Sequence, residues 1–190
     1  MESLTSGPPS LPRRVNATTR VPFNTLAKSY HNTAYGCIEL CLIPPINQSQ
    51  SVACKALERS LPAVLPGVLD SRVPTFVGAV DKIWSHLVLT HYDGALYNAS
   101  IIASNVSASQ AFPGFPLTAH WAGSQPPVGS SGPNTVQVMA TATAEFSLAV
   151  FGNRVEGFGL YGGFRGSNST AEPAGTTVLE RSEVFFGRAQ

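Results

Sequence analysis

Histidine and carboxylate side chains that lie close together are the first candidates for chemistry in this sequence. His86 and His91 lie in one β-prone segment, and Asp93 follows directly. His91 could act as a base oriented by the Asp93 carboxylate at a hairpin tip, although a hydrogen-bonded turn is the more common role of such a pair. Residues five apart on a strand point to opposite faces. We therefore expect no metal ion shared by the two histidines, and no cofactor.

A second group of candidates depends on which strand faces point into the protein. If Trp84 and His86 share an inward face with Glu145 and Tyr161, a barrel pocket would hold an acid/base pair and an aromatic wall. Together with His91 and Asp93, these residues form the candidate ligand pocket. The alternative is a barrel that is filled by its own side chains.

The segment around residues 138–145 bears on the size of such a pocket. One face of this strand carries three alanines in four positions, and the other face is bulkier. We expect the alanine face to be inward, which predicts a small cavity. The two faces are Val138, Ala140, Ala142 and Ala144, and Met139, Thr141, Thr143 and Glu145.

Three cysteines, Cys37, Cys41 and Cys54, bear on redox chemistry. No spacing is C-x-x-C and no histidine pair lies nearby, which argues against a zinc site. In an oxidising compartment one pair would form a disulfide. Cys37 and Cys41 would lie about 13 Å apart along one strand, too far for a bridge. The sequence therefore predicts a Cys41–Cys54 disulfide that closes the intervening loop, with Cys37 buried and free.

The composition is that of a globular domain with few charges. The chain has 190 residues, 43% of them apolar and 12% charged, and a formal net charge of +1. This length suits one domain, and the scattered lysines and arginines form no basic stripe for nucleic acid. No apolar run approaches the roughly 20 residues of a membrane-spanning helix. We expect a flexible arm over residues 1–20 and one domain over residues 21–190, with neither a nucleic-acid nor a membrane partner.

Five N-x-S/T sequons are a mark of secretion, because such acceptors lie on the surfaces of secreted proteins. The first 14 residues contain three prolines and no apolar core of a signal peptide. We expect secretion if the chain is part of a longer precursor, and a cytoplasmic location if it is complete. The expected glycosylation sites are Asn16, Asn47, Asn98, Asn105 and Asn168.

Short β-prone segments separated by turn signals dominate the sequence. Residues 23–35 are expected to form a helical turn or loop and residues 35–42 a strand, which Pro44 and Pro45 end. Ser51 is a candidate N-cap of a short helix that reaches residue 61. Asp93-Gly94 is a strong hairpin signal between strands 84–91 and 96–103. Further strands are expected at 136–150, 154–161 and 176–186, and the whole pattern predicts a mainly β, antiparallel barrel or sandwich.

Several motifs, taken in order, resemble a known family. They are Tyr30-His-Asn-Thr-Ala-Tyr-Gly36, Ile38-Glu-Leu-Cys41, Trp84-Ser-His-Leu87, His91-Tyr-Asp-Gly94, Ala144-Glu-Phe146, Gly157-Phe-Gly-Leu160 and Glu180-Arg-Ser-Glu-Val-Phe185. Together they resemble the C-terminal domain of basidiomycete serine β-lactamase/transpeptidase-like proteins. The resemblance covers about residues 22 to 188 and implies a lipocalin-like, up-and-down β-barrel. Lys28 stands where the family usually has glycine, which weakens the match at that turn.

The catalytic signature of those hydrolases is missing from the chain. They use Ser-x-x-Lys, in which the lysine activates the serine. The residues three positions before Lys28, Lys55 and Lys82 are threonine, valine and alanine. A Lys-Thr-Gly element is also absent, and Tyr30-His-Asn32 lies in the expected first strand of the barrel rather than in a catalytic domain.

Two functions therefore remain open from the sequence. The first is a non-catalytic accessory domain that packs on a serine hydrolase domain or caps its cleft. The second is a free-standing lipocalin-like barrel that binds a small apolar molecule, with cyclase or isomerase activity in fungal secondary metabolism as the enzymatic version.

Overall fold

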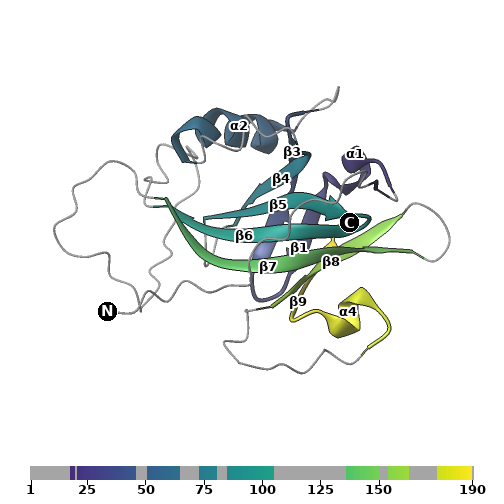
Figure 1. Cartoon of the computed structure of the whole chain (residues 1–190). Helices are drawn as coiled ribbons and strands as arrows, with labels where there is room; N and C mark the ends of the chain where they lie inside the picture. Colours follow the sequence, from purple (N-terminus) through teal and green to yellow (C-terminus); the bar gives the residue numbers. More distant parts are fainter. Residues whose placement is uncertain are drawn as a thin grey trace, which may run out of the picture.

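The computed structural model describes residues 18–19, 21–45, 51–64, 73–80, 85–104, 136–149, 154–162 and 175–189. The protein is mainly β, and nine strands form one antiparallel sheet that curls into a nearly closed barrel (Figure 1). The predicted fold class is thereby confirmed. The strands are β1 Ser29–Asn32, β2 Gly36–Glu39, β3 Cys41–Ile43, β4 Thr75–Ala79, β5 His86–Asp93, β6 Leu96–Ser104, β7 Val136–Leu148, β8 Val155–Tyr161 and β9 Val184–Arg188.

The hairpin of β5 and β6 forms where the sequence predicts it. Gly94 adopts a φ of 57°, the left-handed conformation that this turn requires. The two strands pair from His86 opposite Ile102 to Asp93 opposite Leu96, with an irregularity between His91 and Asp93. From β4 to β9, strands adjacent in the sequence are adjacent in the sheet, as in an up-and-down barrel.

The barrel closes through one bent stretch of chain. β2 pairs with β1, whereas β3, which follows after the single residue Leu40, pairs with β4. At the bend, the Leu40 N–H donates to the Lys28 carbonyl oxygen at 3.0 Å. Gly78 allows β2 to approach β4, since a Cβ there would lie 2.5 Å from Cγ1 of Ile38. The two strands at the ends of the sheet, β2 and β3, are thus consecutive in the chain and joined by the bend at Leu40.

Three helices accompany the sheet in the described part of the chain: α1 Phe23–Leu26, α2 Val52–Val64 and α4 Val178–Arg181. The Ser51 hydroxyl accepts a hydrogen bond from the Cys54 N–H at 3.0 Å, as expected of the predicted N-cap. The helix runs three residues beyond its expected end and includes Pro62. Proline so near the C-terminal end removes one backbone hydrogen bond and leaves most of the helix intact.

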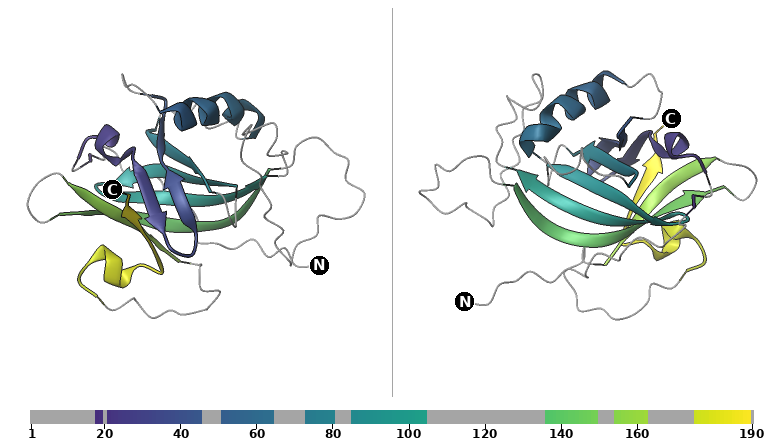
Figure 2. Two further views of the ribbon diagram at one scale, coloured as in Figure 1. Left: turned by 180° about the vertical axis from the view of Figure 1, so that it is seen from behind. Right: turned by 45° about the horizontal axis from the view of Figure 1, so that its top comes forward.

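α2 lies against the outer wall of the barrel, over the strands at one side (Figure 2). Its inner residues Cys54, Leu57 and Leu61 pack with outward-facing residues of β3 to β6 in a second apolar core. The predicted disulfide is present: Cys41 of β3 is bonded to Cys54 of α2. The helix is therefore joined covalently to the wall that it covers.

Two sequence-based expectations about this region are wrong. Cys37 is free but exposed rather than buried, because its neighbour Ile38 takes the inward position on β2. Residues 176–186 do not form one strand: α4 occupies residues 178–181 and β9 begins at residue 184. The Thr177 hydroxyl caps the Glu180 N–H, and the Glu180 carboxylate accepts from the Thr177 N–H, which stabilises this turn against the extended form.

Residues 23–35 contain more regular structure than expected. The segment forms α1 and then β1, whose pairing with β9 at Tyr30 and His31 completes the wall. Residues 1–17, which hold most of the expected N-terminal arm, lie outside the described residues, as do the central residues 105–135. The division into an arm and one domain stays a prediction.

Candidate functional site

Aromatic side chains fill the described interior of the barrel. They form a continuous set of ring contacts, with centroids 5.0 to 6.2 Å apart. Every ring of the central set is at most 2% exposed. Phe23 of α1 packs onto this set from the end of the barrel through Phe76 and His91. The central rings are Tyr30, Phe76, Tyr97, Phe146, Phe158 and Phe186.

The alanine face of β7 is inward, as predicted. Ala142 and Ala144 belong to the interior core, and Ala140 packs against it. Thr141, Thr143 and Glu145 alternate with them and lie on the outer face; the Val138 and Met139 side chains are not among those described. Phe146 and rings from the neighbouring strands pack beside the alanines. The expected small cavity stays a prediction.

His91 is one of the interior residues. Its ring is 0% exposed and makes edge contacts with Phe23 and Tyr97 at 5.2 Å. Asp93 lies beyond the irregularity at the end of β5 and is partly exposed. An arrangement of His91 as base and Asp93 as orienting carboxylate stays a prediction.

His86 faces away from the interior, so the condition that it shares an inward face with the other candidate residues is not met. It lies opposite Ala79 of β4 and Ile102 of β6, on the outer face that α2 covers, because Leu87 and Leu89 take the inward positions of β5. The ring is 3% exposed, and burial lowers the pKa of His86 to about 4. Its Nδ1 lies 3.0 Å from the Ser85 hydroxyl, and Nε2 has no partner among the described residues. Trp84 lies outside the described residues.

Glu145 and Tyr161 lie together, but outside the barrel rather than in a pocket within it. The Tyr161 hydroxyl donates to Oε2 of Glu145 at 3.1 Å, and Nη2 of Arg181 in α4 donates to the same oxygen at 3.0 Å. Burial, and then the Glu145 charge, raise the pKa of Tyr161. These contacts join α4 to the wall of β7 and β8. The described structure thus places His86, His91 and the Glu145–Tyr161 pair apart from one another, and the complete pocket, which includes Trp84, stays a prediction.

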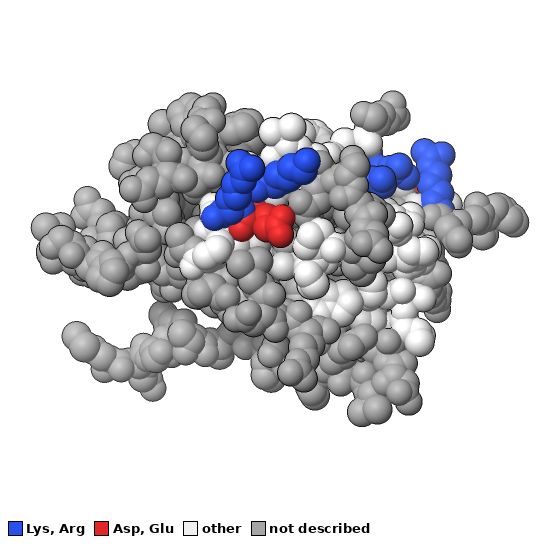
Figure 3. Space-filling model, turned by 90° about the horizontal axis from the view of Figure 1, so that it is seen from above, with Lys and Arg blue, Asp and Glu red and all other residues white. Residues whose placement is uncertain are grey.

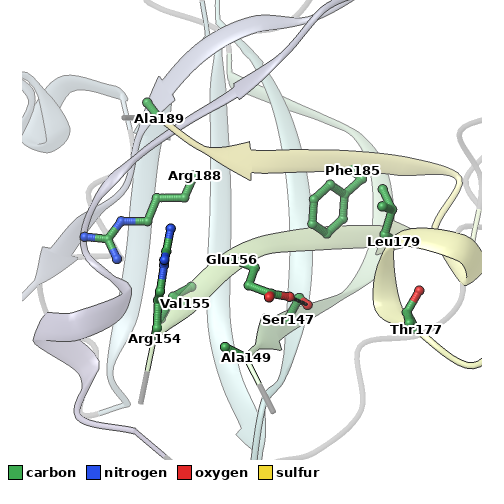
Figure 4. Close-up of a pocket in the computed structure, with 10 residues that line it drawn as sticks. All are labelled: Ser147, Ala149, Arg154, Val155, Glu156, Thr177, Leu179, Phe185, Arg188 and Ala189. Atoms are coloured by element: carbon green, nitrogen blue, oxygen red, sulfur yellow. Dashed lines mark hydrogen bonds between the residues drawn. The ribbon is translucent and has the colours of Figure 1, made fainter. Parts of the chain in front are cut away.

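A groove on the outer wall is one concave site among the described residues. Its volume is about 780 Å³, and it extends from the rim, where β8 begins and β9 ends, along the wall to α4 (Figure 4). Arg154 and Arg188 extend into its rim end, and Phe185 and Leu179 lie towards α4. It is lined by Ser147, Ala149, Arg154, Val155, Glu156, Thr177, Leu179, Phe185, Arg188 and Ala189.

Two local features shape this groove. A bulge in the pairing of β7 and β8 leaves Glu156 without an opposite residue and turns it outward, where its Oε2 accepts from the Ser147 hydroxyl at 3.0 Å. Gly157 lets the Phe185 ring lie flat on the wall, because a Cβ at that position would lie 2.5 Å from Cζ of the ring. Bulge and glycine together produce a shallow recess with an aromatic side.

The groove residues were not among the candidates from the sequence. Arg154 directly precedes β8 and Arg188 is the last residue of β9, so antiparallel pairing of these strands brings the two arginines to the same rim. With the last strand expected at residues 176–186, Arg188 lay beyond it. A last strand placed at residues 184–188 would have indicated that Arg188 lies at the same rim as Arg154.

Charged side chains are sparse on the described surface. On the face seen in Figure 3, lysine and arginine form two small groups and no continuous basic strip among the residues described. No group of three potential metal ligands occurs among those residues, and none of their helices has the length and apolar character to span a bilayer.

Asn98, one of the five expected glycosylation sites, lies on β6 opposite Thr90 and Thr143 and is partly exposed. The other four sequons lie outside the described residues.

Comparison with known proteins adds no relative. No protein-family model matches the chain, and neither a curated protein nor a solved structure is significantly similar to it.

Proposed function

We propose that this chain is a non-catalytic accessory β-barrel domain that packs on a serine hydrolase domain of the β-lactamase/transpeptidase-like type. The observation that carries the proposal is the filled interior of the barrel. A lipocalin-like binding protein needs a lumen for its ligand, whereas six aromatic rings occupy the described lumen here. The motifs that resemble the fungal C-terminal domain support the same function.

The distribution of reactive side chains agrees with a non-catalytic role. An active site brings an acid, a base and a polarising group to one concave place. Here His86 lies on the outer face that α2 covers, and His91 lies inside the barrel. Glu145 forms an ion pair with Arg181 of α4. Among the described residues, no histidine lines the outer groove.

A direct test uses the purified chain together with a hydrolase domain of that family from which its own C-terminal barrel has been removed. The chain alone should neither hydrolyse a chromogenic β-lactam nor be labelled by a fluorescent penicillin, because no Ser-x-x-Lys is present to activate a nucleophile. Added to the truncated hydrolase, it should raise the melting temperature of the hydrolase in proportion to complex formed.

Two exposed apolar residues serve as matched variants. Val52 on α2 and Leu179 on α4 are 86% and 59% exposed and lie on different sides of the barrel. Val52→Asp and Leu179→Asp introduce the same charge, so loss of the thermal shift in one of them identifies the docking side. A covalent penicillin adduct on the chain, or no thermal shift with the unmodified chain, would overturn the proposal.

A further inference from the structure

The two arginines of the outer groove form no ion pair with a carboxylate among the described residues, and both are exposed. Glu156, the carboxylate among the described lining residues, accepts a hydrogen bond from Ser147. Two guanidinium groups at one rim repel each other, and an anion placed between them relieves this repulsion. Guanidinium groups also match the two oxygens of a carboxylate in geometry.

The rest of the groove is suited to an apolar body. The Phe185 ring and the exposed Leu179 side chain lie towards α4, and Ala149 and Ala189 add apolar surface to the groove. Exposed leucine beside an aromatic ring is costly in water and is covered when an apolar group binds. A charged end and an apolar body therefore have separate places in the same groove.

Size and net charge define the ligand further. A volume of about 780 Å³ is in the range of small-molecule sites. Arg154, Arg188 and Glu156 together leave one net positive charge in the groove. We propose that this groove binds a small organic monocarboxylate with an aromatic or short aliphatic body, its carboxylate on Arg154 and Arg188 and its apolar part on Phe185 and Leu179. The site is separate from the barrel interior and does not depend on the accessory-domain function.

The test is an NMR titration of the ¹⁵N-labelled chain with 3-phenylpropionate. For a ligand of about 11 non-hydrogen atoms, we expect a Kd on the order of a few millimolar. The amide signals that shift should be those of Val155, Glu156, Phe185 and Leu179. Two analogues with the same ring serve as controls: 3-phenylpropanol lacks the charge, and phenyl phosphate carries a second one.

Charge-matched variants distinguish specific contacts from general electrostatics. Arg154→Gln and Arg188→Gln should each weaken binding about fivefold, the factor that corresponds to roughly 1 kcal/mol. Arg59→Gln removes the same charge from the exposed face of α2, away from the groove, and should leave the Kd unchanged. Each variant should keep the wild-type spectrum outside the groove, which shows that it is folded.

Five results would overturn the proposal. Four concern the ligands: shifts confined to interior residues such as Leu87 and Phe76, equal binding of 3-phenylpropanol, tighter binding of phenyl phosphate, and no saturable binding at all. The fifth is equal weakening by the α2 variant, which would show that only the overall charge matters. Saturable, carboxylate-dependent shifts at the groove that both groove variants weaken would establish the site.

Discussion

Replacement of His86 by leucine should remove most of the pH dependence of folding stability between pH 7.5 and 4.5. Burial under α2 lowers the pKa of His86 from 6.5 to about 4. Between these two values the unfolded chain binds a proton that the folded chain does not bind. Stability is therefore complete above pH 6.5 and falls as the pH falls towards 4.

The size of the effect follows from the two pKa values. The stability lost relative to pH 7.5 is about 1 kcal/mol at pH 5.5 and about 2–3 kcal/mol at pH 4.5. Leucine has no proton to bind and is compatible with the apolar neighbours Ala79 and Ile102, so His86→Leu should lose this component. Other groups that titrate remain the same in both proteins and cancel in the difference.

Urea-unfolding curves of the wild type and of His86→Leu at pH 7.5, 6.5, 5.5 and 4.5 measure this difference. The gap between the two free energies of unfolding should change by about 2–3 kcal/mol across the series, in favour of the variant at low pH. His31→Leu, at an exposed position on β1, is the control and should follow the wild type. Parallel curves for the wild type and His86→Leu would refute the reasoning.

Three further predictions concern packing and cross-links. Tyr97→Phe removes a buried hydroxyl that has no partner among the described residues, so this variant should be as stable as the wild type or more stable. Tyr30→Phe removes a 2.8 Å hydrogen bond and should lower the free energy of unfolding by about 1 kcal/mol. Equal losses of the two variants in urea unfolding would contradict this. Reduction of the disulfide that joins α2 to β3 should lower the free energy of unfolding by about 2–4 kcal/mol, and an unchanged urea midpoint in reductant would count against it. Gly157→Ala brings a Cβ onto a backbone oxygen and the Phe185 ring and should lower the free energy of unfolding by about 1–3 kcal/mol. In Gly187→Ala the new Cβ meets only ordinary contacts at 3.9 Å, so the loss of stability should be smaller. Similar thermal unfolding of the two variants would contradict the packing argument.

Local signals in the sequence were sufficient for much of the fold. Asp93-Gly94 specified a hairpin because few other residues adopt its turn conformation, and Ser51 marked the start of α2 because its hydroxyl satisfies a free N–H. The loop between Cys41 and Cys54 could be closed by only one geometrically sensible pair. The alanine face of β7 was identified as inward because bulky polar side chains alternate with it.

The candidate site depended on information that local patterns do not contain. The alternation in β5 left open which face was inward, because the local pattern does not show that α2 covers the face of His86. The rings beside the alanines of β7 come from β6 and β8, and local patterns do not show which rings meet in the interior. Thr177 and Glu180 did contain a capping signal, but the β-branched residues around them favoured a strand, and the arginine pair was missed as a result.

Closure of the barrel at Gly78 has a consequence for contacts between molecules. A sheet that ends in unpaired strands offers its backbone N–H and C=O groups to another copy, and this is a route to aggregation. Here β2 and β3 are the two ends of the sheet, and the bend at Leu40 joins them while Gly78 lets β2 lie against β4. A side chain at position 78 would press on Ile38 and hold β2 further from β4, which would leave these two ends of the sheet more accessible. The missing side chain at this single position thus helps to keep the protein from pairing with itself.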